Sequence, residues 1–171
     1  MQTTDSTTLP LDSPERRRLP PLLRRAWYGL NQALRRRLVH LKLTPDQFTV
    51  LRTLVEAEPE GLTQKDVAAI ISSDPNTIAS LLERMETNGM VERSEDESDR
   101  RARRIRLLPH GRKIYRAARN VAIELQEEVL ASLSPDKRET FLECLASIAD
   151  ACNRAAETSE RSSADKNIPP K

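Results

Sequence analysis

The feature of this sequence that most limits its fold is a change of hydrophobic period at Gly89. Between Thr63 and Asn88, apolar residues recur at three- and four-residue steps in two short runs, which predicts two short helices. Asp74 and Pro75 suit the start of the second helix, because Asp caps free N–H groups and Pro fits the first turn. Gly89 suits its end, because glycine adopts the left-handed conformation easily.

A β-hairpin is predicted directly after these helices. Residues 90–93 read as a short strand, residues 95–101 as a charged loop, and residues 102–108 as an alternating strand. In the alternating strand, Ile105 and Leu107 share one side while Arg104 and Arg106 share the other. Two short helices joined by a tight turn form a helix-turn-helix, and a hairpin that follows directly is a wing.

Longer helices are expected on both sides of this segment. They start at Pro14 or Pro21, at Thr44-Pro45, at Pro109 and at Ser134-Pro135. The expected fold is mainly α with a small β-hairpin wing, a winged helix-turn-helix plus a helical dimerisation region. The expected boundaries are a flexible N-terminal tail at 1–14, dimerisation helices at 15–43 and 109–155, the winged helix-turn-helix domain at 44–108, and a flexible C-terminal tail at 156–171.

Composition argues against several other classes of protein. The chain has 4 glycines and no arrangement of Ser/His/Asp, Cys/His or paired carboxylates, so neither a phosphate loop nor an enzyme is expected. His40 and His110 lack partners at metal-binding spacing, so no metal or other cofactor is expected. Cys144 and Cys152 lie about 12 Å apart along one helix, too far for an intramolecular disulfide, and their redox role stays open.

The chain shows no signal-peptide core and no apolar run of about 20 residues, which favours a cytoplasmic protein. Its net charge is only +2, but residues 98–119 are rich in Arg and Lys and contain Asp99 as their one acid. A local basic field attracts phosphate, so nucleic acid is the expected partner. An ordinary solvated charged surface is the alternative interpretation.

Polar side chains near the start of the two short helices are candidate DNA contacts. Asn can pair with adenine in the major groove, Thr can offer its methyl group to thymine, and a helix N-terminus favours phosphate. Alternatively, Asn76 and Thr77 only satisfy the free N–H groups of the first turn. The helical candidates are Gln64, Lys65, Ser73, Pro75, Asn76, Thr77, Ser80 and Arg84.

Residues 62–111 resemble the winged helix-turn-helix core of the MarR family of regulators. The closest match is residues 85–93 (METNGMVER), followed by Asp99-Arg100-Arg101 and by a Pro-x-Gly helix start at Pro109. The resemblance extends over about residues 14–154. Leu108 replaces a helix-capping Thr of the family, Ser73 replaces a commonly apolar turn residue, and the first helix lacks the Cys of peroxide-sensing relatives.

The resemblance implies a sequence-specific regulator that binds double-stranded DNA, a ligand-responsive repressor acting as a homodimer on a pseudo-palindromic operator. One wing arginine, matched by Arg101, is expected to enter the minor groove, where the negative potential is concentrated. The wing candidates for DNA contact are Asp99, Arg100, Arg101 and Arg103. Asp99 is expected to hold the wing tip in shape, through Arg84 or a neighbouring arginine.

The resemblance also implies a small aromatic effector between the dimerisation helices and the DNA-binding head. Candidate pocket residues are Trp27, His40 and Tyr115, with ordinary packing or surface as the alternative for each.

A dimer is also expected from geometry. Two recognition helices must reach successive major grooves, about 34 Å apart, and the long flanking helices need a surface to bury against. The candidate interface residues are Leu23, Trp27, Leu30, Phe141, Leu145, Ile148 and Cys152, each with a monomer core as its alternative. The alternative function is a winged-helix module that binds protein or RNA without sequence-specific DNA binding.

Overall fold

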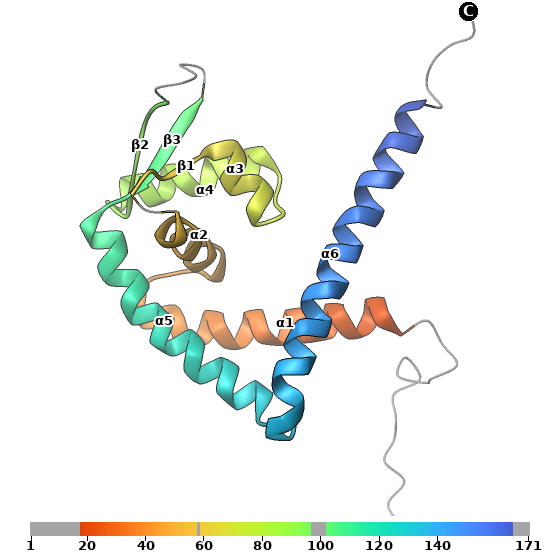
Figure 1. Ribbon diagram of the computed structural model, residues 1–171. Coiled ribbons are helices and arrows are strands. Elements are labelled where there is room, and N and C mark those ends of the chain that lie inside the picture. Colours follow the sequence, from red (N-terminus) through yellow and green to blue (C-terminus); the bar gives the residue numbers. More distant parts are fainter. Residues whose placement is uncertain (1–17, 58, 97–101, 166–171) are drawn as a thin grey trace, which may run out of the picture. The chain divides into compact units, whose positions relative to one another are not determined.

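The computed structural model describes residues 18–57, 59–96 and 102–165 (Figure 1). The chain forms two compact units, residues 1–125 and 126–171, and each is described by itself. In chain order the elements are α1 Leu19–Leu38, a 3-10 turn Val39–Leu41, α2 Pro45–Glu56, β1 Leu62–Thr63, α3 Gln64–Ile70, α4 Pro75–Thr87, β2 Val91–Glu95, β3 Arg103–Leu107, α5 Pro109–Leu130 and α6 Pro135–Asp165. The expectation of a mainly helical fold with a small hairpin is confirmed.

The helix-turn-helix consists of α3 and α4. Asp74 caps α4, because its carboxylate accepts the N–H groups of Asn76 and Thr77 at 2.9 and 3.1 Å. Gly89 ends the helix with a φ of 66°, as the sequence predicts. The turn between the helices holds Ser72 at a φ of 53°, a left-handed conformation that is uncommon for residues with a Cβ atom.

The two preceding helix starts are also capped by threonine. Thr44 accepts the N–H of Gln47, and the Gln47 side chain accepts the N–H of Thr44 in return, which completes a capping box. Thr63 accepts the N–H of Asp66 at 3.1 Å, and its hydroxyl donates to the Asp66 carboxylate at 2.6 Å. These local bonds fix where α2 and α3 begin.

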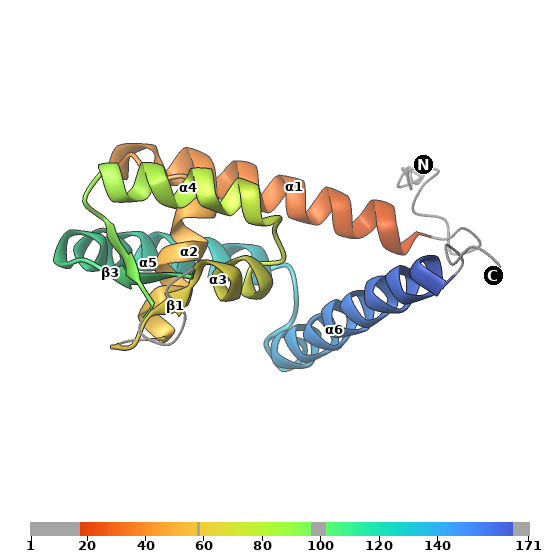
Figure 2. The same ribbon diagram turned by 90° about the horizontal axis from the view of Figure 1, so that it is seen from above.

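One hydrophobic core joins α2, α3, α4, the sheet and the first half of α5. The largest fully buried side chains are Leu38, Val50, Leu51, Leu54, Val67, Ile78, Leu82, Met85, Val91 and Ile105. The buried residues of α4 recur at helical spacing, so one face of this helix packs into the core and the other faces out. Figure 1 shows α2 lying between α1 and the helix-turn-helix of α3 and α4 within the first unit, and Figure 2 shows the same elements from above.

The sheet has three antiparallel strands in the order β1-β3-β2. In the central strand, Ile105 lies opposite Leu62 of β1 and Arg93 of β2. Ile105 and Leu107 are buried, whereas Arg104 and Arg106 are partly exposed, so the alternation expected for this strand is confirmed. The sequence analysis did not predict β1, because a two-residue strand carries no detectable period.

Two glycines permit close backbone contacts around β3 and α5. Gly61 has a φ of 71°, and a Cβ atom there would lie 2.3 Å from the carbonyl oxygen of Ile105. At Gly111, a Cβ atom would lie 2.2 Å from the carbonyl oxygen of Met90. Leu108, where the family commonly has a capping Thr, donates its own N–H to the Met90 oxygen at 3.0 Å. Backbone contact with Met90 therefore holds the start of α5.

The second unit contains the end of α5 and the whole of α6. Helix α6 follows Ser134, whose carbonyl oxygen accepts the N–H of Lys137 at 3.0 Å. The helix continues to Asp165, whereas the sequence analysis placed a flexible tail from residue 156. The extension is reasonable because no Gly or Pro occurs after Pro135 until Pro169.

Candidate nucleic-acid interface

Helix α4 presents a polar face at its N-terminal half. Its buried residues are Ile78, Leu81, Leu82 and Met85. The side chains that the sequence analysis selected for DNA contact lie on the exposed part of the helix: Pro75, Asn76, Thr77, Ser80 and Arg84. This division between core and surface makes α4 the element best suited to enter a major groove.

The cap of α4 organises the first turn of this face. The Thr77 hydroxyl donates a hydrogen bond to the Asp74 carboxylate, in addition to the two backbone N–H groups that this carboxylate accepts. The Thr77 hydroxyl, the Thr77 N–H and the Asn76 N–H together hold the pKa of Asp74 below its ordinary value of 3.8. Asp74 therefore satisfies the first-turn N–H groups. The side-chain amide of Asn76, unlike its backbone N–H, is not among the hydrogen-bonding groups of this cap.

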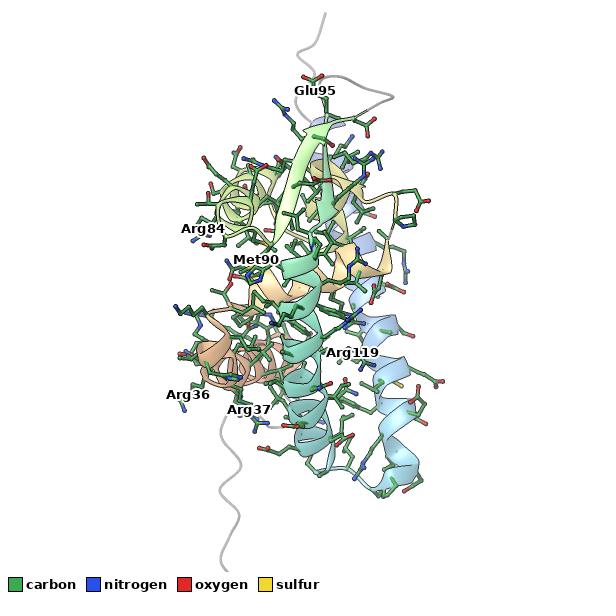
Figure 3. All side chains as sticks on the ribbon, turned by 90° about the vertical axis from the view of Figure 1, so that its left-hand side faces the viewer. Arg36, Arg37, Arg84, Met90, Glu95 and Arg119 are labelled. Carbon is green, nitrogen blue, oxygen red and sulfur yellow. The ribbon has the colours of Figure 1, made fainter. Side chains whose placement is uncertain are left out.

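Arg84 lies one turn after Ser80 on the exposed side of α4. Its Nε donates to the Ser80 carbonyl oxygen at 3.3 Å. Figure 3 shows Arg84 pointing outward from α4, with Glu95 at the far end of β2. The predicted partner of Arg84, Asp99, lies outside the described residues, as do Arg100 and Arg101.

The N-terminus of α3 lies beside the base of the wing. Gln64 and Lys65 line a small hollow of about 220 Å³ together with Thr63, Ala102 and Arg103. Lys65 and Arg103 are exposed, so two of the predicted basic contacts lie close together on one surface. Such a pair suits a DNA phosphate, which positions a protein without reading sequence.

An ion pair fixes β2, the first strand of the hairpin, to α4. The Arg93 Nε and Nη2 atoms lie 2.7 Å from Glu86 Oε2, and the Arg93 N–H donates to Glu86 Oε1 at 3.1 Å. Both residues belong to the METNGMVER segment on which the family resemblance rests. Part of that motif therefore holds β2 against α4.

A second ion pair, which the sequence analysis missed, lies at the base of the wing tip. The Asp96 side chain is only 1% exposed, and Arg104 Nε and Nη2 each lie 2.5 Å from its Oδ2 atom. Arg104 Nη1 also donates to the carbonyl oxygens of Glu60 and Gly61 at 3.3 and 3.2 Å. The sequence pattern that could have revealed this pair is the opposite charges of Asp96 and Arg104, which lie at equal distances along the chain from Arg100 in a predicted hairpin.

A mostly apolar hollow of about 640 Å³ lies between α1, α2 and α4. Trp27, Leu30 and Leu34 line it from α1, while Thr77, Ile78, Leu81 and Arg84 line it from α4. Of the three predicted pocket residues, Trp27 lies in this lining, whereas His40 lies exposed after α1. Tyr115 instead stacks on Phe48 with ring centroids 5.9 Å apart.

The predicted interface residues include several exposed apolar side chains. In the first unit, Trp27 is 64% exposed, Leu30 is also exposed and Leu23 is partly buried. In the second unit, Phe141 and Leu145 are exposed, Ile148 is partly buried, and Cys152 is exposed. Large apolar side chains left in solvent are typical of surfaces that bind another chain.

Cys144 and Cys152 both carry free thiols. Among residues 18–57, 59–96 and 102–165, no group of three or more His, Cys, Asp or Glu side chains is arranged to hold a metal ion. No helix in the described part of the chain has the length and apolar character needed to cross a membrane.

Comparison with known proteins supports the resemblance to the MarR family. Residues 43–102 match the model of the MarR family. The chain is 35% identical over 101 residues to the transcriptional regulator HosA of Escherichia coli O157:H7, covering 59% of this chain and 73% of HosA. It is 31% identical over 135 residues to the HTH-type transcriptional regulator TtmR of Methylorubrum extorquens, covering 79% of this chain and 67% of TtmR.

Solved structures of DNA complexes share the fold. The repressor CouR bound to a 23-mer DNA duplex superposes with a TM-score of 0.70 at 30% identity, covering 77% of this chain and 92% of CouR. The MepR–DNA complex of Staphylococcus aureus gives a TM-score of 0.72 at 24% identity, covering 78% of this chain and 97% of MepR. This chain therefore belongs to the MarR family of DNA-binding transcriptional regulators, which are not enzymes.

Proposed function

We propose that this chain is a homodimeric repressor that binds a pseudo-palindromic DNA operator and releases it when a small aromatic effector binds. The observation that carries the proposal is the exposed polar face of α4, whose first turn is organised by Asp74. In this proposal, Asn76, Thr77 and Ser80 read base edges in the major groove. A side-chain amide can pair bidentately with adenine, and the Thr methyl group can contact thymine.

The proposed phosphate contacts come from the start of α3, from the turn before α4 and from the base of the wing. Gln64, Lys65 and Arg103 surround one hollow at the base of the wing, and two of them are cationic. Ser73 lies in the turn that leads into α4. Residues 99–101 would place Arg101 in the minor groove, where a narrow groove concentrates negative potential. This arrangement assigns DNA binding to residues 44–108.

The proposed dimer uses residues 15–43 and 109–155. Exposed Trp27 and Leu30 on α1, and exposed Phe141 and Leu145 on α6, would be buried against a second copy of the chain. A symmetric dimer places two copies of α4 on successive turns of a palindromic site. Sedimentation at micromolar protein concentration should give twice the chain mass of 19.4 kDa. A mass of a single chain would contradict the dimer.

The proposed effector site is the hollow between α1, α2 and α4. Its lining combines Trp27 with apolar Leu30 and Leu34, which suits an aromatic ring. CouR of Rhodococcus jostii RHA1, a structural relative, has been solved with bound p-coumaroyl-CoA. Because Thr77 and Arg84 of α4 also line the hollow, an occupant would contact the recognition helix directly. Effector binding and DNA binding would then compete for the same conformation of α4.

Fluorescence anisotropy tests the central proposal. The full chain is titrated into a labelled duplex from its own upstream region and into a random duplex of equal length, at two salt concentrations. We expect tighter binding to the upstream duplex and a preference that persists at the higher salt. Equal, weak and salt-sensitive binding to both would contradict sequence-specific regulation by this site and favour a protein- or RNA-binding module.

The matched variants are Asn76→Ala on α4 and Arg52→Gln on α2. Asn76→Ala should weaken binding to the preferred duplex by about 1–3 kcal/mol, as for the loss of a base contact, and should reduce the preference over random DNA. Arg52 is exposed and pairs only with Glu56 one turn away in the described contacts, so its loss should leave the preference unchanged. Equal effects of both variants would remove α4 from the proposed recognition surface.

A further inference from the structure

A buried ion pair closes the base of the wing and ties it to the loop before β1. Arg104 donates to the Asp96 carboxylate at 2.5 Å and, from its Nη1 atom, to the carbonyl oxygens of Glu60 and Gly61. The Asp96 N–H donates to the Ala102 carbonyl oxygen at 3.2 Å. One arginine thus connects three segments: the end of the first wing strand, the second wing strand and the loop before β1.

We propose that Asp96 and Arg104 are positioning residues that set the direction of the wing on DNA without contacting DNA themselves. This inference rests on the proposed DNA-binding function. Asp96 directly follows β2 and Ala102 directly precedes β3, so the hydrogen bond between them and the Asp96–Arg104 pair join the two strands at this end of the hairpin. The hydrogen bond from Arg104 to the Gly61 carbonyl oxygen ties this end of β3 to the loop before β1.

Burial makes this contact specific for the two residues present. An ionised carboxylate in a site with 1% exposure needs a close cation, and Arg104 supplies one. The planar guanidinium reaches the Asp96 carboxylate and two carbonyl oxygens at once, which a single lysine ammonium does not reproduce. Gly61 also lies close to the backbone of β3, because a Cβ atom there would meet the Ile105 oxygen.

Electrostatics and positioning predict opposite effects of neutralising Asp96. Removing a negative charge from a DNA-facing wing should strengthen DNA binding if the charge acted only through its field. If the carboxylate positions the wing, its removal should weaken binding. We expect Asp96→Asn to bind the preferred upstream duplex several-fold more weakly than the native chain, and Asp96→Ala and Arg104→Lys about tenfold more weakly.

Glu95→Gln is the matched control for Asp96→Asn. Glu95 is the neighbouring residue, it is exposed, and its neutralisation removes the same charge from the adjacent position at the end of β2. We expect this control to bind DNA as tightly as the native chain or more tightly. Equal weakening by Glu95→Gln and Asp96→Asn, or tighter binding by Asp96→Asn, would overturn the proposal.

Double-mutant cycles separate wing positioning from general damage to the fold. If Asp96 acts through the wing tip, Asp96→Ala should add little to the loss caused by Arg101→Ala. The same substitution should add fully to Asn76→Ala, because the recognition helix is a separate contact. Full additivity with Arg101→Ala would show that Asp96 does not act through the tip.

Amide hydrogen exchange on the DNA-free chain tests the positioning role of Asp96 and Arg104 separately from the proposed DNA-binding function. We expect Asp96→Asn to speed exchange within residues 91–96 and 102–107 while α2 and α5 retain native protection. If Asp96→Asn keeps the native duplex preference and the native exchange rates, the positioning role of Asp96 and Arg104 is overturned, whereas the proposed DNA recognition is not. A native chain without duplex preference would overturn the proposed function, and the exchange rates would still decide whether the pair holds the wing.

Discussion

Ser72 occupies the tight turn of the helix-turn-helix in a conformation that favours glycine. Its φ of 53° places the Cβ atom close to backbone, at a cost of about 1 kcal/mol for an L-residue. Ser72→Gly should therefore raise the free energy of unfolding by about 0.5 kcal/mol, after the larger unfolded-state entropy of glycine is subtracted. Urea denaturation of the native chain and the variant measures this difference.

The adjacent serine provides the control for this prediction. Ser73 does not have a positive φ, so Ser73→Gly gains no relief of strain and increases the entropy of the unfolded chain. It should lower the free energy of unfolding by about 0.4–1 kcal/mol. Destabilisation by both glycines would show that the left-handed turn is not strained at Ser72.

Asp74 makes the stability of α4 depend on pH. The Thr77 hydroxyl, the Thr77 N–H and the Asn76 N–H lower its pKa in the folded chain. Its ionised form therefore stabilises the fold above the unfolded pKa, and this contribution disappears as the pH falls through the lower folded pKa.

Asp74→Asn tests this pH dependence, because asparagine also caps helices but does not titrate in this range. Urea midpoints measured at about pH 6 and about pH 3 should fall less in Asp74→Asn than in the native chain. An identical fall in both proteins would mean that the cap does not contribute to acid unfolding.

Among the helices and strands, the sequence predicts those features that are set by contacts between residues close together in the chain. Thr44, Asp74 and Gly89 mark helix ends through bonds and backbone conformations within a few residues of themselves. The alternation through Ile105 marks the central strand in the same way. Short-range signals of this kind were sufficient for the helix-turn-helix and the hairpin.

Features that depend on distant segments were not predicted. Strand β1 exists because Leu62 pairs with Ile105, which lies far along the chain. Arg104 contacts Glu60 and Gly61 for the same reason, and neither contact produces a local pattern. The candidate site followed the same rule: the exposed face of α4 was predictable, whereas the hollow beside Trp27 depends on the tertiary arrangement of α1, α2 and α4.

Two helical glycines show how tertiary packing reverses a local preference. Gly29→Ala on α1 meets no atom within 4 Å, so the better helix former should raise the free energy of unfolding by about 0.5–1 kcal/mol. Gly111→Ala on α5 places a Cβ atom 2.2 Å from the Met90 oxygen and should lower it by about 1–3 kcal/mol. Thermal and urea unfolding of both variants measure the two signs, and equal signs would contradict the close contact at Met90.

At the scale of the whole molecule, the proposed function requires two copies of α4 to bind one operator. Each copy would contribute half of the DNA contacts, so the affinity of the dimer depends on the interface that joins the copies. Phe141 and Leu145 leave an exposed apolar stripe on α6 that has helical spacing. Burial of this stripe against a second copy of the chain would link the stability of the dimer to DNA binding.

Leu145→Glu should disrupt that step, because it places a charge in a surface that the dimer buries. We expect sedimentation to shift toward the mass of one chain and the affinity for the preferred duplex to fall at least tenfold at nanomolar protein. Ser147→Glu introduces the same charge on the other side of α6, where the Ser147 hydroxyl bonds only within the helix in the described contacts, and should leave both measurements native. If Leu145→Glu remained dimeric, α6 would be excluded from the interface. If it became monomeric and still bound the duplex with native affinity, the link between dimerisation and DNA binding would be lost, and each winged helix would act alone.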